Sequence, residues 1–325
     1  MLIIGVSFAR ARKGSFVMRP SSRVFRWTLR RSEYPVPLRV RLMRRQWARG
    51  DARRDRGFTP PPTVRRYTNL SYGPNGAWNL LDVYTPKEAA RPLPVIVSVH
   101  GGGYFYGCKE TYQYYCMDLA RRGFGVVNFN YRLAPEYRFP APLADLNAVL
   151  RWVCERGAEF GLDRNNLFLV GDSAGAQIAS QYAAIWSDPS YARRFPFSVP
   201  DLRLAAVGLN CGMYDLRRRA RERDQIIRDY LGPNPAVYGG KLDVLSHVGP
   251  NYPPAYFLSA PNDFLVGECI PTARLFASRG CETAYKIYGE RVDPMAGHVF
   301  HVNPALAIAK EANDDETAFF RRFLR

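Results

Sequence analysis

Short apolar runs recur along most of this chain, and the stretches between them are long enough to hold helices. Apolar runs of about four to eight residues bounded by glycine, proline or polar residues are typical of buried strands. Strands that alternate with helices form a mainly parallel sheet covered by helices on both faces. The pattern therefore predicts an α/β fold of this kind, with strands near residues 80–84, 94–100, 125–130, 167–171, 204–210, 255–260 and 283–288.

Two further segments, residues 36–48 and residues 216–247, have helical patterns. Residues 216–247 are rich in arginine and include Tyr230 before a Gly-Pro pair. We expect both segments to pack over the sheet as a helical cap. No run of about 18 apolar residues occurs, so no membrane-spanning helix is predicted. In the first segment, residues 36–48, apolar side chains recur among arginines: Leu38, Val40, Leu42, Met43 and Trp47.

Basic residues are concentrated at the start of the chain. Residues 1–66 carry 18 Lys or Arg and three acidic residues, whereas residues 67–325 carry 28 basic and 26 acidic residues. The net charge of +17 therefore belongs mainly to the N-terminal part. We divide the chain into a basic leader at 1–33, expected to be disordered, a cap helix segment at 34–66, and an α/β domain at 67–325 with a cap insertion near 216–247.

The leader allows four interpretations. Its arginines follow the apolar residues 2–8 and no small-residue cleavage site is present, which argues against a secretory signal. Its composition fits a transit peptide, a nucleic-acid-binding arm or a disordered start. It contains Phe25 and Trp27 among arginines but no recognisable nucleic-acid-binding module. We therefore do not predict a nucleic-acid partner.

The strongest chemical signal is the sequence Gly-Asp-Ser-Ala-Gly at residues 171–175. An apolar run precedes it, and small and apolar residues at helical spacing follow it at 176–186. A G-x-S-x-G sequence between a strand and a helix is typical of a nucleophile elbow. The two glycines are needed because the sharp turn strains the serine backbone and leaves no room for flanking side chains. Ser173 is the predicted nucleophile.

A glycine-rich loop, His-Gly-Gly-Gly-Tyr at residues 100–104, follows another predicted strand. Acyl transfer builds negative charge on a carbonyl oxygen, and fixed backbone N–H groups stabilise that charge. The predicted donors of this oxyanion hole are Gly102, Gly103 and Ala174. A phosphate-binding loop is the alternative, but the Gly-Lys-Ser/Thr and G-x-G-x-x-G patterns are both missing. His100 is expected to shape the loop, because the base should follow the serine in the chain.

The order Ser, then Asp or Glu, then His guides the search for the other catalytic groups. His298 lies in a loop after the last predicted strand, where a base can reach back over the sheet edge. His301 is its alternative, whereas His247 comes too early in the chain. Asp263 follows the strand at 255–260, at the carboxyl end where α/β sheets place their chemistry. Asp215 is the alternative acid, although its position also suits a helix N-cap.

Four polar residues near these motifs are given structural roles. Asp172 is expected to point away from the tip of the elbow. Arg132 and Glu136 are predicted to form an ion-paired or hydrogen-bonded corner. Asp145 is expected to begin or line a helix at 147–156.

Aromatic residues follow the glycine loop and occur in both cap segments. Aromatic walls bury a large area and leave a compact pocket rather than a long channel. We therefore predict Tyr104 and Trp47 as substrate-binding residues, with a preference for short acyl chains from acetyl to hexanoyl. The alternative is that the tyrosines pack beneath the cap without touching substrate.

The six cysteines show no spacing typical of a zinc site. Without a convincing secretory signal, free thiols in a reducing compartment are expected, which places the protein in the cytoplasm. Most of them should act as small core residues. They are Cys108, Cys116, Cys154, Cys211, Cys269 and Cys281.

Five motifs in this order resemble the hormone-sensitive-lipase-like carboxylesterases, a branch of the α/β-hydrolases. The resemblance covers residues 65–325. The chain departs from the family pattern at Val299 and Ala176, where the family often has glycine. The motifs are His-Gly-Gly-Gly at 100–103, Tyr-Arg-Leu-Ala-Pro-Glu at 131–136 followed by Phe-Pro-Ala, Gly-Asp-Ser-Ala-Gly at 171–175, Asp-Phe-Leu at 263–265, and His298.

The resemblance implies a serine esterase that needs no cofactor or metal, with Ser173 as nucleophile, His298 as base and Asp263 as the acid that orients it. It also implies a cap built partly from N-terminal helices. The expected reaction is hydrolysis of a small ester through an acyl-enzyme on the serine. An amidase, peptidase or formamidase is the first alternative, because it would use the same groups. A non-catalytic binding protein is less suited, because receptors that resemble this family lose the base.

Overall fold

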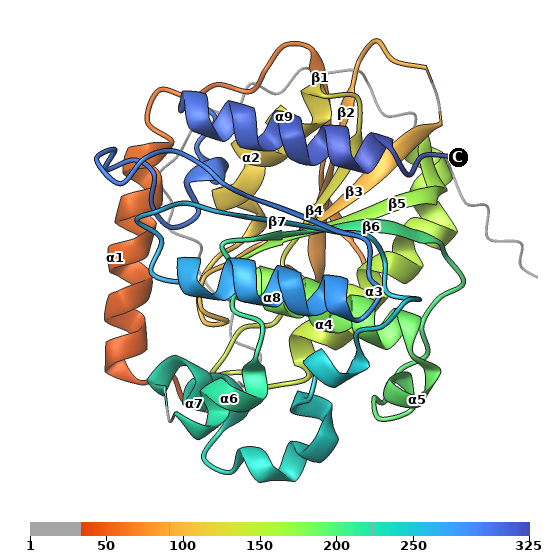
Figure 1. Ribbon diagram of the computed structural model, residues 1–325. Helices are drawn as coiled ribbons and strands as arrows, with labels where there is room; N and C mark the ends of the chain where they lie inside the picture. Colours follow the sequence, from red (N-terminus) through yellow and green to blue (C-terminus); the bar gives the residue numbers. More distant parts are fainter. Residues whose placement is uncertain (1–33, 91, 223) are drawn as a thin grey trace, which may run out of the picture. The chain divides into compact units, whose positions relative to one another are not determined.

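One sheet forms the centre of the fold, with the strand order β1-β2-β4-β3-β5-β6-β7-β8 (Figure 1). This computed structural model describes residues 34–325 except residues 91 and 223, so the predicted leader at 1–33 lies outside the described residues. Strands β1 and β2 pair antiparallel, as do β2 and β4, and the remaining neighbours are parallel. The strands are β1 (Val64–Ser71), β2 (Leu80–Pro86), β3 (Leu93–Val99), β4 (Gly125–Phe129), β5 (Leu162–Asp172), β6 (Leu204–Asn210), β7 (Ala255–Ser259) and β8 (Thr283–Ile287).

Each of the seven predicted strand runs coincides with one of the strands β2 to β8, which confirms the mainly parallel sheet. Strand β1 was not predicted. Its sequence, Val-Arg-Arg-Tyr-Thr-Asn-Leu-Ser, buries only Val64, because the strand lies at the edge of the sheet. An edge strand of this kind does not show the apolar pattern that marks a buried strand. It also extends across the predicted boundary between residues 66 and 67.

Helices cover both faces of the sheet, as expected for this fold class (Figure 1). Helices α2 (Lys109–Arg121) and α9 (Ala307–Arg321) lie on one face, where the ring of Phe320 stacks on Phe168 of β5 at 4.8 Å. Helices α3 (Ala141–Arg156), α4 (Ala174–Ser187) and α8 (Val266–Ser278) lie on the other.

Helix α3 begins earlier than predicted, at Ala141 rather than residue 147. Proline is tolerated in the first turn of a helix, and Pro142 occupies such a position here. Asp145 therefore lies inside this helix rather than before it.

The predicted cap segments form short and long helices beside the carboxyl ends of the strands. Helix α1 (Leu38–Arg54) runs along one side, and its N-terminal end lies beside α7 (Gln225–Leu231) (Figure 1). Arg39 of α1 forms an ion pair with Asp229 of α7. The insertion contains α6 (Leu216–Arg221), α7 (Gln225–Leu231), η3 (Pro235–Leu242) and η4 (Leu245–His247). The remaining short elements are η1 (Gly76–Asn79), η2 (Gly157–Phe160), α5 (Pro189–Ala192) and η5 (Phe300–Val302). Among the described helices, none has the length and hydropathy to cross a bilayer.

Helix α1 is six residues longer at its C-terminal end than the predicted 36–48, and only part of its predicted apolar face is buried. Val40 is fully buried, and Trp47 packs against Phe105 at 4.8 Å. Leu38 and Leu42, however, are 69% and 53% exposed. They project from the opposite side of the helix to Val40 and Trp47, so the apolar residues of this segment do not form a single buried face.

Candidate active site

Ser173 lies in a sharp turn between β5 and α4, in the position predicted for a nucleophile elbow. Its backbone has φ 53° and ψ −118°, a strained conformation for a residue with a side chain. A Cβ on Gly171 would lie 2.3 Å from the Gly175 oxygen, and a Cβ on Gly175 would lie 2.1 Å from the oxygen of Val99. The structure thus gives the steric reason for both glycines.

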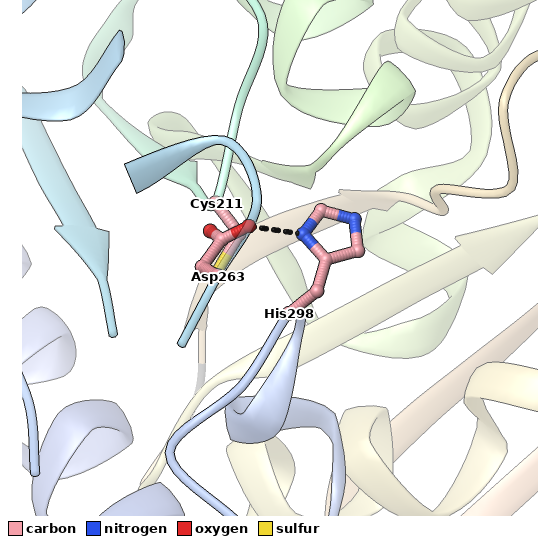
Figure 2. A group of neighbouring side chains, drawn as sticks. All are labelled: Cys211, Asp263 and His298. Carbon is pink, nitrogen blue, oxygen red and sulfur yellow. Dashed lines mark hydrogen bonds and ion pairs between the residues drawn. The ribbon is translucent and has the colours of Figure 1, made fainter. Parts of the chain in front are cut away.

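Three side chains from separate loops meet at the carboxyl edge of the sheet. His298, in the loop after β8, places Nε2 3.0 Å from Ser173 Oγ. Its Nδ1 lies 2.7 Å from Oδ1 of Asp263, which follows β7 (Figure 2). These distances suit an Nδ1–H that donates to the carboxylate and a serine hydroxyl that donates to Nε2. The structure therefore brings together the residues predicted as nucleophile, base and acid.

Asp263 is held by hydrogen bonds on both carboxylate oxygens. Besides the contact with His298, it accepts hydrogen bonds from the Ser259 hydroxyl at 2.7 Å and the Leu265 amide at 2.9 Å. Burial alone would raise the pKa of Asp263, but the hydrogen bond and charge of His298, together with the hydrogen bonds from Leu265 and Ser259, outweigh it and the pKa is lowered. The carboxylate is therefore charged and fixed in orientation beside the imidazole.

The alternative candidates lie elsewhere. His301 is fully buried, and neither ring nitrogen has a hydrogen-bond partner among the described residues. Burial lowers the pKa of His301 to about 3. His247 contacts Asp188 with Nδ1 at 2.6 Å, away from the serine. Asp215 accepts a hydrogen bond from the amide of Arg218 at 2.8 Å and so caps α6.

The glycine loop presents backbone amides close to the serine. Gly102 and Gly103 have φ values of 113° and 58°, and a Cβ on Gly102 would lie 2.2 Å from the Tyr106 oxygen. Glycine therefore suits both positions. The amides of Gly102, Gly103 and Ala174 have no acceptor within the described part of the chain, and all three residues line the same cavity as Ser173.

A buried relay behind the loop was missed by sequence reasoning. The Tyr112 hydroxyl donates to Asp172 Oδ2 at 2.7 Å and accepts from the Gly101 amide at 3.0 Å. Burial raises the pKa of Asp172 to about 7, although the hydrogen bond from Tyr112 opposes the rise. Asp172 therefore anchors the glycine loop. Tyr112 stands among several tyrosines in the sequence, and no local signal separates it from them.

Arg132 and Glu136 are both ion-paired, as predicted, but their ion pairs are with residues of other segments. Arg132 pairs with Asp145 at 2.9 Å, because the early start of α3 brings that carboxylate to it. Glu136 pairs with Arg44 of α1 at 2.7 Å. Arg44 also donates to the backbone oxygen of Phe105, which follows the glycine loop, and to that of Ala134. The corner therefore ties α1 to the loop rather than closing on itself.

A cavity of about 500 Å³ opens in front of Ser173. Trp47 and Tyr104, the predicted substrate-binding residues, both line it. Tyr104 is only 2% exposed, because its ring stacks on Tyr230 at 3.8 Å. Tyr106, one of the aromatic residues that follow the glycine loop, also lines the cavity. Sequence reasoning missed the other apolar lining residues, which come from loops and from α7: Met213, Ile226, Ile227, Phe264, Leu265 and Val299.

Cys211 lies beside the histidine and the acid, as Figure 2 shows. The ligand atoms of Cys211, Asp263 and His298 lie within 4.8 Å of one another, which is a spacing that a metal site could have. Both nitrogens of His298 already face hydrogen-bond partners, however. Burial also holds the pKa of the Cys211 thiol well above its ordinary value, whereas a metal requires the thiolate. The donor set suits a hydrogen-bond array better than a metal.

The order of the sheet, the elbow and the loop define the class of the protein, an α/β-hydrolase. The BD-FAE family profile matches residues 81–267, more than half of the chain, and the chain belongs to this family. The solved structure of Esterase B from Lactobacillus rhamnosis superposes with a TM-score of 0.80 at 25% identity, over 88% of this chain and 94% of that protein.

Curated relatives also carry esterase names. Esterase LipQ from Mycobacterium tuberculosis is 29% identical over 255 residues, which cover 74% of this chain and 59% of LipQ. Carboxylesterase NlhH from the same species is 37% identical over 139 residues, 40% of this chain and 42% of NlhH. The matches thus span three fifths or less of these relatives. They confirm the predicted resemblance to α/β-hydrolase esterases.

Proposed function

We propose that this protein is a serine carboxylesterase in which Ser173 is the nucleophile, His298 the general base and Asp263 the acid that orients it. The observation that carries the proposal is the continuous contact from Ser173 Oγ to His298 Nε2 at 3.0 Å and from His298 Nδ1 to Asp263 at 2.7 Å. The esterase names of the relatives support the ester as substrate class.

The reaction follows from these contacts. His298 takes the serine proton as Oγ attacks the ester carbonyl, and the charged Asp263 stabilises the imidazolium that forms. The amides of Gly102, Gly103 and Ala174 receive the negative charge that develops on the carbonyl oxygen. His298 then gives the proton to the leaving alcohol. Water repeats the same steps on the acyl-enzyme and releases the acid.

The cavity supports a small ester with a short acyl chain, from acetyl to hexanoyl. Its volume of about 500 Å³ is closed on one side by Trp47 of α1 and on another by residues of α7. Residues 34–66 and 216–247 therefore act as the cap over the catalytic domain. A cytoplasmic location is supported by the six cysteines, each of which is a free thiol as expected in a reducing compartment.

The experiment is a panel of p-nitrophenyl esters from acetate to palmitate, with an anilide added because an amidase would use the same groups. We expect a maximum at short chains, little anilide hydrolysis, and no ester hydrolysis by a folded Ser173→Ala variant. An organophosphate should label Ser173 in the wild-type protein. Normal turnover by Ser173→Ala contradicts the mechanism, and a maximum at palmitate contradicts the compact pocket.

A further inference from the structure

The outer side of helix α1 carries a continuous basic stripe. Residues three or four apart lie on one side of a helix. By this spacing Leu38, Arg41, Leu42, Arg45, Arg49 and Arg53 share one side of α1, and all six are exposed. We call these six residues the outer stripe. The opposite side of the same helix carries the buried Val40 and the cavity-lining Trp47, Asp51 and Arg54.

The charge of the outer stripe is not balanced by its surroundings. None of its four arginines forms an ion pair with any acid in the described part of the chain. Arg41 and Arg45, Arg45 and Arg49, and Arg49 and Arg53 are each four residues apart. Like charges at this spacing destabilise a helix. A solvated helix face normally alternates the sign of its charges. The stripe is therefore arranged for an anionic partner.

The chain itself offers no suitable partner at its N-terminal side. Residues 1–33 contain eight Lys or Arg and a single acid, Glu33. Their net charge has the same sign as that of the stripe. The sequence of this segment therefore carries no excess of negative charge that could balance the stripe.

Two exposed leucines indicate the kind of anion. Leu38 and Leu42 occupy the first turns of the outer stripe and leave most of their side-chain surface in water. Arginines beside exposed apolar side chains on one helix face suit the boundary between lipid headgroups and acyl chains. Nucleic acid would instead favour aromatic side chains among the arginines, and the aromatic residue of α1, Trp47, faces inward.

We propose that the outer stripe of α1 docks the protein on an anionic lipid surface, with its arginines at the headgroups and Leu38 and Leu42 at the acyl boundary. The inner side of the helix lines the cavity in front of Ser173, so docking holds that cavity one helix diameter from the lipid. The proposal concerns binding and does not rest on the hydrolase reaction.

The test is cosedimentation of the full chain with vesicles of phosphatidylcholine containing phosphatidylglycerol, with pure phosphatidylcholine as the neutral surface. Each arginine near an anionic surface contributes about fivefold to partitioning, so the variant Arg41→Gln/Arg45→Gln/Arg49→Gln should bind about 100-fold less. The variant with lysine at the same three positions should retain binding. Leu38→Ser/Leu42→Ser should lose most of the binding that survives high salt.

A matched control removes three exposed arginines outside the stripe that also form no ion pair in the described structure, as Arg164→Gln/Arg193→Gln/Arg274→Gln. This control should bind the vesicles like the wild type. That result would show that binding depends on the outer stripe and not only on the net charge of the protein. Equal losses in both variants, or an unchanged stripe variant, overturn the proposal. Stripe-dependent binding to an RNA oligonucleotide without binding to the vesicles, or full competition by millimolar inorganic phosphate, overturns it as well.

Discussion

Two histidines three residues apart lie in opposite surroundings. His298 is partly exposed, and both of its ring nitrogens face hydrogen-bond partners, Ser173 and Asp263. His301 lies in η5, which contacts α2 and α9; its ring packs on Tyr115, and neither nitrogen has a partner in the described structure. Burial lowers the pKa of His301 to about 3, so it remains neutral. The same side chain serves as a base candidate in one place and as a core residue in the other.

The carboxyl groups of the two regions differ in the same way. Asp263 receives hydrogen bonds at both oxygens, and its pKa is lowered despite burial. Glu316 of α9 is fully buried, and neither of its oxygens makes a hydrogen bond within the described chain. Burial raises the pKa of Glu316 to about 7. Burial penalises charge in both regions, and the partners decide whether the charge survives.

The largest expected effect comes from His298→Ala, which removes the proposed base. We expect kcat to fall by about 10⁶-fold, as for loss of the histidine from another serine hydrolase. His301→Ala should leave kcat within about twofold and lower the melting temperature, because it leaves a cavity in the core. Steady-state kinetics on a p-nitrophenyl ester and thermal unfolding measure both. The reverse ranking of kcat would move the base to His301.

Asp263→Asn should have the next largest effect. An amide in place of the carboxylate favours the wrong imidazole tautomer and lowers kcat by about 10⁴-fold. Asp215→Asn is the control, because Asp215 caps α6 and does not contact His298. A small cost in melting temperature is expected there. A near-silent Asp263→Asn together with an inactive Asp215→Asn would reassign the acid.

The meeting of the three candidate residues at one edge of the sheet could be predicted from sequence, because they stand at positions fixed by chain order. Ser173, Asp263 and His298 each follow a strand whose apolar run is visible, and parallel strands end at one edge of the sheet. The seven predicted strands are confirmed for the same reason. The edge strand β1 escaped prediction because its mainly exposed sequence lacks an apolar run.

Partnerships between distant segments could not be predicted. Arg132 pairs with Asp145 and Glu136 with Arg44 because α3 starts early and α1 folds over the loop. The relay from Gly101 through Tyr112 depends on which tyrosine of α2 faces the elbow. Sequence spacing places residues along an element, but it does not determine which group opposes them from another element.

Two tyrosines of α2 sharpen the comparison between partnered and unpartnered groups. The Tyr112 hydroxyl links Asp172 to the Gly101 amide, whereas the hydroxyl of Tyr115, also buried, has no partner among the described residues. Tyr112→Phe should lower kcat about tenfold. The effect should be smaller than the 10²–10³-fold cost of losing an oxyanion donor, because the substitution loosens the loop without removing a donor.

The readout must separate loop positioning from general stability. We expect KM to change little in Tyr112→Phe, and affinity for a boronic acid transition-state analogue to fall in parallel with kcat. Tyr115→Phe should match the wild type in kcat and in analogue affinity. Equal kinetic effects of the two substitutions would show that Tyr112 acts only through stability.

The smallest expected effect on activity, and a measurable one on stability, comes from Glu316→Gln. The pKa of Glu316 is raised from 4.5 to about 7 in the folded protein. The protonated carboxyl of Glu316 therefore stabilises the folded protein fully at pH values below the pKa of this group in the unfolded chain. That stabilisation is lost as the pH rises through about 7, the pKa in the folded protein. Glutamine stays neutral at every pH and removes this loss. Burial is the main cause of the raised pKa of this carboxyl, the charge of Asp172 adds to it, and Asn210 and the charge of Arg122 oppose it.

Urea unfolding at pH 5 and pH 8 measures the effect. The fall in the free energy of unfolding between these two pH values should be smaller in Glu316→Gln by about 3 kcal/mol, an order-of-magnitude figure from the size of the shift. Asp172 shows a similar rise in pKa to about 7, so part of the pH dependence should persist in this variant. Ester hydrolysis should be unchanged, because Glu316 does not line the cavity. An unaltered pH dependence would mean that Glu316 is charged in the folded protein, and the contrast with Asp263 would then fail.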